Sequence, residues 1–198
     1  MTALWIAVGA LAILAILEAL AILALAREVG LLSRRLPPAP ALESLEGTEP
    51  GAALPPLRLA DARSGRPSSP DLQSRPAVVL FLSTRCTLCA DLLSELDGVV
   101  KDWPDHAIVP VLSGPAEEAR AMLERSGFAG QAWQDDGPAM RAVGIVTTPR
   151  ALLVDTAGVV RSRGVVNNRE MVSSLIQGRV RTGEGAVWVE GDSVSSAP

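Results

Sequence analysis

The longest apolar run of the chain lies near its N-terminus, over residues 3–26, and Glu18 is its only charged residue. At a rise of about 1.5 Å per residue, a helix of this length crosses a hydrocarbon core of about 30 Å. The pattern predicts one transmembrane helix, with residues 1–26 as a membrane anchor. A cleavable secretory signal is the alternative, because residues 24–26 have the small-x-small form of a cleavage site. The length of the run and the lack of a preceding basic side chain favour the anchor.

Charged residues in and after this run bear on its surroundings and orientation. Glu18 is costly where it faces lipid. It therefore either contacts a partner helix or an interface, or is protonated or reaches toward water. Arg27, Arg34 and Arg35 follow the run, so the positive-inside rule favours a cytoplasmic C-terminal domain.

The next segment, residues 27–56, is expected to be a tether, because its many prolines and glycines resist regular structure. We expect one compact domain over residues 57–178. Residues 179–198 are polar and rich in glycine, and we expect a tail there that can form a short strand at residues 186–189.

Within the expected domain, buried strands alternate with amphipathic helices. Residues 77–83 are almost entirely apolar, which is typical of a strand buried on both faces. Apolar positions then recur at helical spacing from Cys86, and Gly98 can end this helix. The other predicted elements are a strand at 57–59, a strand at 107–112, a helix from Pro115 to Gly127, a loop containing Trp133, a short helix at 138–143, a hairpin of strands 151–155 and 159–165, and a helix capped by Asn167 or Asn168 and ended by Gly178.

The order of these elements predicts the fold class. Strand, helix, strand and helix in succession imply parallel pairing with right-handed crossovers, whereas the later hairpin is antiparallel. The sequence therefore predicts an α/β domain in which a βαβ half and a ββα half share a central mixed sheet.

Composition removes several classes of function. The net charge is −4, and the four Trp and two Phe accompany no basic stripe, so nucleic acid is not an expected partner. Cys86 and Cys89 are the only cysteines and His106 is the only histidine. These residues can build neither a disulfide framework nor an ordinary four-ligand zinc site, so we expect no metal. Reversible dithiol chemistry remains, unless the thiols simply pack as apolar residues.

The two cysteines are expected to have different roles. Only a thiolate attacks a disulfide sulfur, and the N-terminus of a helix favours the anionic form. Cys86 lies at this exposed start, where Arg85 adds a positive charge, so Cys86 is the expected nucleophile. Cys89 points inward and would resolve the mixed disulfide. The redox-active pair needs no further cofactor, and we expect His106 to be a surface residue without a catalytic part.

A Cys-x-x-Cys pair after a buried strand, Thr148-Pro149 before a strand and the order of elements together resemble the thioredoxin fold over residues 57–178. The resemblance implies that Pro149 is cis and packs beside the cysteines. It also implies that the backbone of Thr148 can pair with an extended substrate segment. An ordinary trans proline at a strand entrance is the alternative.

Two departures from thioredoxins remove the usual clues to redox direction. Leu80 stands where thioredoxins carry a buried acid, so no internal proton acceptor is evident there. Thr87-Leu88 replaces the dipeptides found between the cysteines of reducing and oxidising relatives.

Residues 24–32, 158–161 and 164–170 are similar to the methylamine dehydrogenase accessory family (MauD), a membrane-anchored branch near the TlpA-type proteins. This resemblance covers roughly residues 3–178. It implies export of the domain to the periplasmic face, where it would assist disulfide formation or rearrangement in a methylamine dehydrogenase subunit. The implied partners are a protein with cysteines or disulfides, the membrane and a membrane redox protein. Family members carry proline where this chain has Thr87, which leaves the direction of electron flow open.

The sequence thus predicts a membrane-tethered thiol-disulfide oxidoreductase or isomerase. One alternative is a TlpA-like reductase. Another is a peroxiredoxin-like antioxidant, for which Ser83 stands where a threonine would be expected. The third is a non-enzymatic assembly factor that docks a partner through the groove by Pro149 and the anchor around Glu18.

Overall fold

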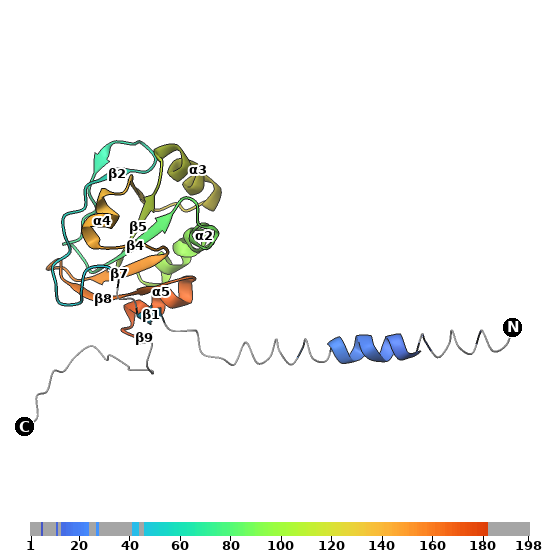
Figure 1. Cartoon of the computed structure of the whole chain (residues 1–198). Helices are drawn as coiled ribbons and strands as arrows, with labels where there is room; N and C mark the ends of the chain where they lie inside the picture. Colours follow the sequence, from blue (N-terminus) through green and yellow to red (C-terminus); the bar gives the residue numbers. More distant parts are fainter. Residues whose placement is uncertain are drawn as a thin grey trace, which may run out of the picture. The chain divides into compact units, whose positions relative to one another are not determined.

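The computed structural model describes residues 46–181 without a gap, together with residues 5, 11, 13–23, 27 and 41–43. The chain divides into two compact units, Met1–Pro38 and Ala39–Pro198. In the first unit, residues 13–23 are helical (Figure 1). The rest of the anchor predicted at residues 1–26 lies mostly outside the described residues. Among the helices that are described, none is both long enough and apolar enough to cross a membrane.

A mixed sheet forms the centre of the second unit (Figure 1). Across the described residues its strand order is β3-β2-β6-β5-β4-β7-β8-β1-β9. The strands are β1 (Ala41–Glu43), β2 (Leu59–Asp61), β3 (Pro67–Ser68), β4 (Ala77–Ser83), β5 (Ala107–Ser113), β6 (Trp133–Asp135), β7 (Arg150–Val154), β8 (Val160–Val165) and β9 (Val180–Arg181). Strand β5 is parallel to β4 and to β6, whereas β7 is antiparallel to both β4 and β8.

Helices cover both faces of this sheet, and Figure 1 shows α4 on the side opposite α2, α3 and α5. Their bounds are α2 (Thr87–Asp102), α3 (Ala116–Ser126), α4 (Pro138–Val143) and α5 (Arg169–Ile176). Strand β4 contributes to both cores, because successive side chains of a strand point to opposite faces. Leu80 and Leu82 pack with α2, α3 and α5, while Val79 and Phe81 pack with α4. Burying such a side chain is worth about 1.5–3 kcal/mol, so β4 anchors the element that follows it.

The predicted mixed α/β architecture is confirmed. The units β4-α2-β5 and β7-β8-α5 form the βαβ and ββα halves. Of the two predicted caps for the last helix, Asn168 is the one used, since its side chain accepts a hydrogen bond from Met171 N–H at 2.9 Å.

The predicted end of the second helix at Gly98 is wrong, because α2 continues to Asp102. The reason is a tertiary contact. A Cβ atom at Gly98 would lie 3.0 Å from Arg169 Nη1, and the same guanidinium binds Asp102 at 2.7 Å. Glycine therefore makes room for an arginine from α5 rather than ending the helix.

Two short elements also differ from the predictions. Trp133, expected in a loop, begins strand β6, where its side chain is buried against the core on the α4 side. The strand expected at residues 57–59 lies instead at Leu59–Asp61. Strands of three residues carry too little alternation to be found from sequence.

The packed region begins earlier than residue 57. Within the predicted linker, Gly51 N–H donates to Val160 C=O and Leu54 N–H to Gly158 C=O, each at 2.8 Å. Ala53 also bridges to Val159. The high proline content of this segment predicted an irregular tether. The residues that lie between Pro50 and Pro55, however, form these backbone hydrogen bonds. The strand expected at residues 186–189 lies outside the described residues.

Candidate functional site

Cys86 lies at the N-cap of α2, at the end of the turn that follows β4. Its Sγ accepts a hydrogen bond from Cys89 N–H at 3.2 Å. The first N–H groups of a helix lack intrahelical partners, and together with the helix dipole they favour an anion. The side chain is half-buried, and both cysteines are free thiols. Cys86 therefore lies at the partly accessible start of the helix, where the sequence places it, and its role as the nucleophile stays a prediction.

Cys89 lies about one turn further along α2, and its side chain is fully buried in the core that this helix covers. Burial, and to a lesser degree the hydrogen bond with the Cys86 side chain, raise the pKa of the Cys89 thiol to about 12. Hydrogen bonds with the Ser83 backbone and the Thr148 side chain act in the opposite direction. Leu80 is fully buried in the same apolar cluster and offers no proton acceptor. Cys89 is therefore protonated near neutral pH.

The loop before β7 reaches the cysteine pair. The Thr148–Pro149 peptide is cis, as the resemblance to thioredoxins implies. Pro149 is buried and Thr148 is half-buried, with its side chain at Cys89. Within the part of the chain that the structure describes, neither the N–H nor the C=O of Thr148 has a backbone partner. Both groups are thus available to an added extended segment.

Arg85 extends away from the core beside α3. Its Nη2 lies 3.6 Å from Glu118 Oε1, and the Arg85 side chain is 79% exposed. Thr84 Oγ1 donates to the same carboxylate at 2.7 Å. This hydrogen bond, and to a lesser degree Arg85, lower the pKa of Glu118. The guanidinium thus has a partner that the sequence did not single out, and its effect on Cys86 stays a prediction.

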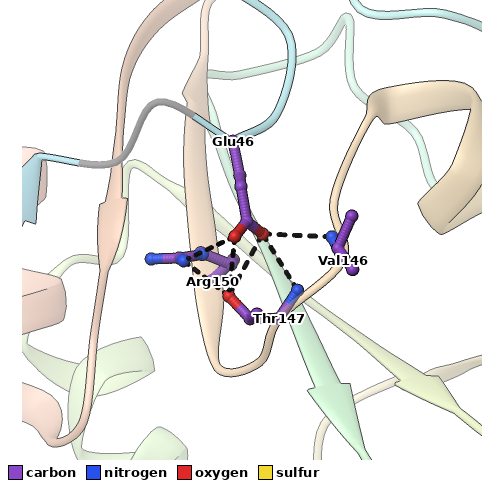
Figure 2. Close-up of polar contacts among 4 residues, drawn as sticks. All are labelled: Glu46, Val146, Thr147 and Arg150. Carbon is purple, nitrogen blue, oxygen red and sulfur yellow. Dashed lines mark hydrogen bonds and ion pairs between the residues drawn. The ribbon is translucent and has the colours of Figure 1, made fainter.

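Sequence reasoning missed Glu46, whose carboxylate binds the loop that carries Thr148 (Figure 2). It accepts hydrogen bonds from the N–H groups of Thr147 and Val146, which are the main causes that lower its pKa to about 2. Arg150 pairs with the same carboxylate. No sequence signal links Glu46 to this loop, since it lies in the proline-rich segment about a hundred positions away.

His106 lies far from the cysteines, at the start of β5, whereas Cys86 follows the end of the parallel strand β4. Its ring meets Trp103 edge-on, with centroids 5.8 Å apart, and desolvation lowers the pKa of its imidazole. Among the residues whose positions are described, no group of three or more His, Cys, Asp or Glu side chains could hold a metal ion.

Comparisons with known proteins agree with this geometry. No family model matches the chain. Methylamine utilization protein MauD from Paracoccus denitrificans is 29% identical over 157 residues, which cover 78% of each protein. The thioredoxin domain of a thiol-disulfide oxidoreductase from Bacteroides vulgatus has a TM-score of 0.57 at 17% identity, covering 65% of this chain and 96% of that one. The chain has a thioredoxin-like fold and is similar to MauD.

The fold is also similar to that of a protein outside the thiol-disulfide oxidoreductases. A peroxidoxin from Mycobacterium tuberculosis has a TM-score of 0.56 at 16% identity, covering 65% of this chain and 95% of that one. The fold alone therefore does not select one thiol chemistry. The MauD relatives and the cysteine pair support the broader conclusion that the chain is a thioredoxin-like redox protein.

Proposed function

We propose that the chain is a membrane-tethered thiol-disulfide oxidoreductase that assists disulfide formation in an exported protein such as methylamine dehydrogenase. The observation that carries the chemistry is the cysteine pair itself. Cys86 Sγ lies at a helix N-terminus and accepts the Cys89 N–H, while the Cys89 thiol lies buried behind it. Such an asymmetric pair suits attack by one sulfur and resolution by the other.

The exchange begins when the Cys86 thiolate attacks one sulfur of a substrate disulfide. An S–S bond forms to Cys86, and the other substrate sulfur leaves as a thiolate. The Cys89 thiol then loses its proton and attacks Cys86 Sγ, which releases the second substrate sulfur. Two electrons have passed from the chain to the substrate, and the reverse sequence oxidises a substrate dithiol.

The second step needs a base, because burial raises the pKa of Cys89. Leu80 supplies no acceptor at the position where thioredoxins carry an acid. The substrate thiolate released in the first step is then the base at hand, and it takes the Cys89 proton as it leaves. Resolution would therefore be coupled to departure of the substrate.

The substrate surface follows from the loops around Cys86. An extended segment can pair with the free backbone groups of Thr148. Leu88, which lies in α2 directly before Cys89, and Val146, which lies in the same loop as Thr148, are exposed apolar side chains. A protein substrate with cysteines or disulfides fits this surface. The methylamine utilization role in the names of the relatives supports methylamine dehydrogenase as the client. The apolar run over residues 3–26 supports membrane tethering. The similarity to MauD supports a domain on the periplasmic face, and we follow it in preference to the positive-inside rule, which favours the cytoplasm.

The decisive experiment uses the full chain in its own membranes. A Cys89→Ser variant should accumulate a mixed disulfide between Cys86 and its client, and a Cys86→Ser control should accumulate none. Failure of the Cys89→Ser variant to capture a protein, while its Cys86 still reacts with an alkylating reagent, would count against the proposal.

The same variants separate the rival functions. A Cys86→Ala, Cys89→Ala chain that still supports maturation would indicate a non-enzymatic assembly factor. Rapid peroxide turnover with a thiol donor would indicate a peroxiredoxin-like antioxidant, and net reduction of the captured client would indicate a TlpA-like reductase. An impermeant thiol reagent that labels Cys86 in intact cells would support the periplasmic location, whereas labelling only after lysis would oppose it.

A further inference from the structure

The segment just before the packed domain runs along the loop that carries Thr148. Gly47 N–H donates to Gly144 C=O at 3.0 Å, and Gly47 C=O accepts a hydrogen bond from Arg163 Nη1. Gly47 has φ +95°, a conformation that suits glycine, and a Cβ there would lie 3.3 Å from Leu152 Cδ2. The backbone therefore fits closely against the start of β7, which places the preceding residue over the loop.

Glu46 binds this loop through both carboxylate oxygens (Figure 2). Oε2 accepts hydrogen bonds from Val146 N–H at 3.1 Å and from Thr147 N–H at 2.9 Å. Thr147 Oγ1 lies 3.1 Å from each oxygen. These are two consecutive backbone donors directed at one charged acceptor, and hydrogen bonds to charged groups are the stronger kind.

Arg150 completes the cluster from the other side of the cis peptide. Its Nη2 lies 3.2 Å from Glu46 Oε1 and donates to Thr147 Oγ1 at 2.5 Å. The Arg150 side chain is only 14% exposed and that of Glu46 is 30% exposed. Partial burial reduces screening by solvent and salt. The carboxylate thus contacts residues that both precede and follow Thr148-Pro149 (Figure 2).

We propose that Glu46 is a positioning residue for the substrate groove. By binding Val146, Thr147 and Arg150, it fixes the two ends of the loop whose centre presents Thr148 to the substrate backbone. Glu46 touches neither cysteine in this scheme and takes no part in the exchange itself. The role rests on the proposed thiol-disulfide exchange, but the clamp on the loop is a property of the fold that can be measured without it.

The kinetic test compares Glu46→Gln with Glu49→Gln in the full chain. Glu49 is an exposed carboxylate in the same segment, and its side chain makes no polar contact among the described residues. With a peptide disulfide as substrate, Glu46→Gln should raise KM by about tenfold, the scale of one charged hydrogen bond. Alkylation of Cys86 by iodoacetamide, which needs no groove, should stay within about twofold.

The outcomes of this test are distinct. A merely structural role for Glu46 would lower peptide exchange and alkylation together, in proportion to the folded fraction, and would overturn the proposal. A KM equal to that of Glu49→Gln would overturn it as well. Restoration of KM toward the unsubstituted value by Glu46→Asp, which keeps the charge, would support it.

Amide hydrogen exchange tests the clamp directly. In Glu46→Gln the N–H groups of Val146 and Thr147 should exchange at least about tenfold faster than in Glu49→Gln, while those of β4 stay unchanged. Unchanged exchange at both N–H groups would overturn the proposal. If the unsubstituted chain transfers no disulfides while the Val146 and Thr147 N–H groups of Glu46→Gln still exchange faster, that result would support the clamp and overturn the proposed function.

Discussion

Two arginine–glutamate pairs flank the cysteine pair, and they differ in their access to water. Arg85 and Glu118 are 3.6 Å apart with side chains 79% and 42% exposed, whereas Arg150 and Glu46 are 3.2 Å apart with side chains 14% and 30% exposed. Arg85 is the one that stands beside Cys86 in the sequence. Its charge faces solvent and a carboxylate, so water and salt screen it.

The better shielded pair belongs to the loop rather than to the nucleophile. Glu46 also binds two backbone N–H groups, which a solvent-facing pair such as Arg85 and Glu118 does not. The comparison indicates that a charged side chain affects the structure around the cysteines when it is shielded from water and binds the backbone. Its distance from Cys86 along the sequence matters less. Three changes test that view, in order of decreasing effect.

The largest expected effect comes from removing the charge of Glu46. In Glu46→Gln, the N–H groups of Val146 and Thr147 and the Arg150 guanidinium lose their charged partner. The free energy of unfolding should therefore fall by about 1–3 kcal/mol at pH 7. The pKa of Glu46 is about 2 in the folded chain against an ordinary 4.5. A lowered folded pKa stabilises the fold above the ordinary value, and this stabilisation disappears as the pH falls toward 2.

Urea unfolding at a series of pH values checks this prediction. The difference between the unsubstituted chain and Glu46→Gln should be constant above about pH 5 and should shrink between pH 4.5 and about 2. Glu49→Gln is the control for loss of a carboxylate from the same segment. A difference that does not change with pH would contradict the assigned ion pair.

The next effect concerns the close fit of Gly47 under the loop. Gly47→Ala should lower the free energy of unfolding by about 1–2 kcal/mol, because an alanine at positive φ is strained. Gly51 has a similar φ of +89°, but a Cβ there would meet nothing within 4 Å. Gly51→Ala therefore has the backbone strain without the contact, and Gly47→Ala should cost more. Equal losses in thermal unfolding would show that the contact with Leu152 is unimportant.

The smallest effect is expected at the exposed pair. Arg85→Gln should slow alkylation of Cys86 by less than about threefold, and the effect should shrink further as salt is raised. Glu118→Gln should act in the opposite direction, because it removes the carboxylate that faces Arg85. The rate of reaction with iodoacetamide measures both. A loss of tenfold or more in Arg85→Gln that persists in high salt would restore Arg85 as the main charge acting on Cys86.

Prediction from sequence succeeded where the signal was local. The apolar run of β4 and the helical spacing after Cys86 were sufficient for the βαβ half. Asn168 was one of the two caps predicted for the last helix, because a cap depends on its own side chain and the next turn. Prediction failed at Gly98, where a preference typical of isolated helices was overridden by a guanidinium from another element.

The sequence by itself therefore determined the fold class and the different placements of Cys86 and Cys89, because these follow from periodicity and a short motif. The cis peptide before Pro149 was expected from the resemblance to thioredoxins. Only the tertiary structure decided that Arg85 faces Glu118, that burial raises the pKa of Cys89, and that Glu46 binds the loop of Thr148. These features depend on which atoms meet across the fold and on how much water they exclude. Neither property can be predicted from the local pattern of residues.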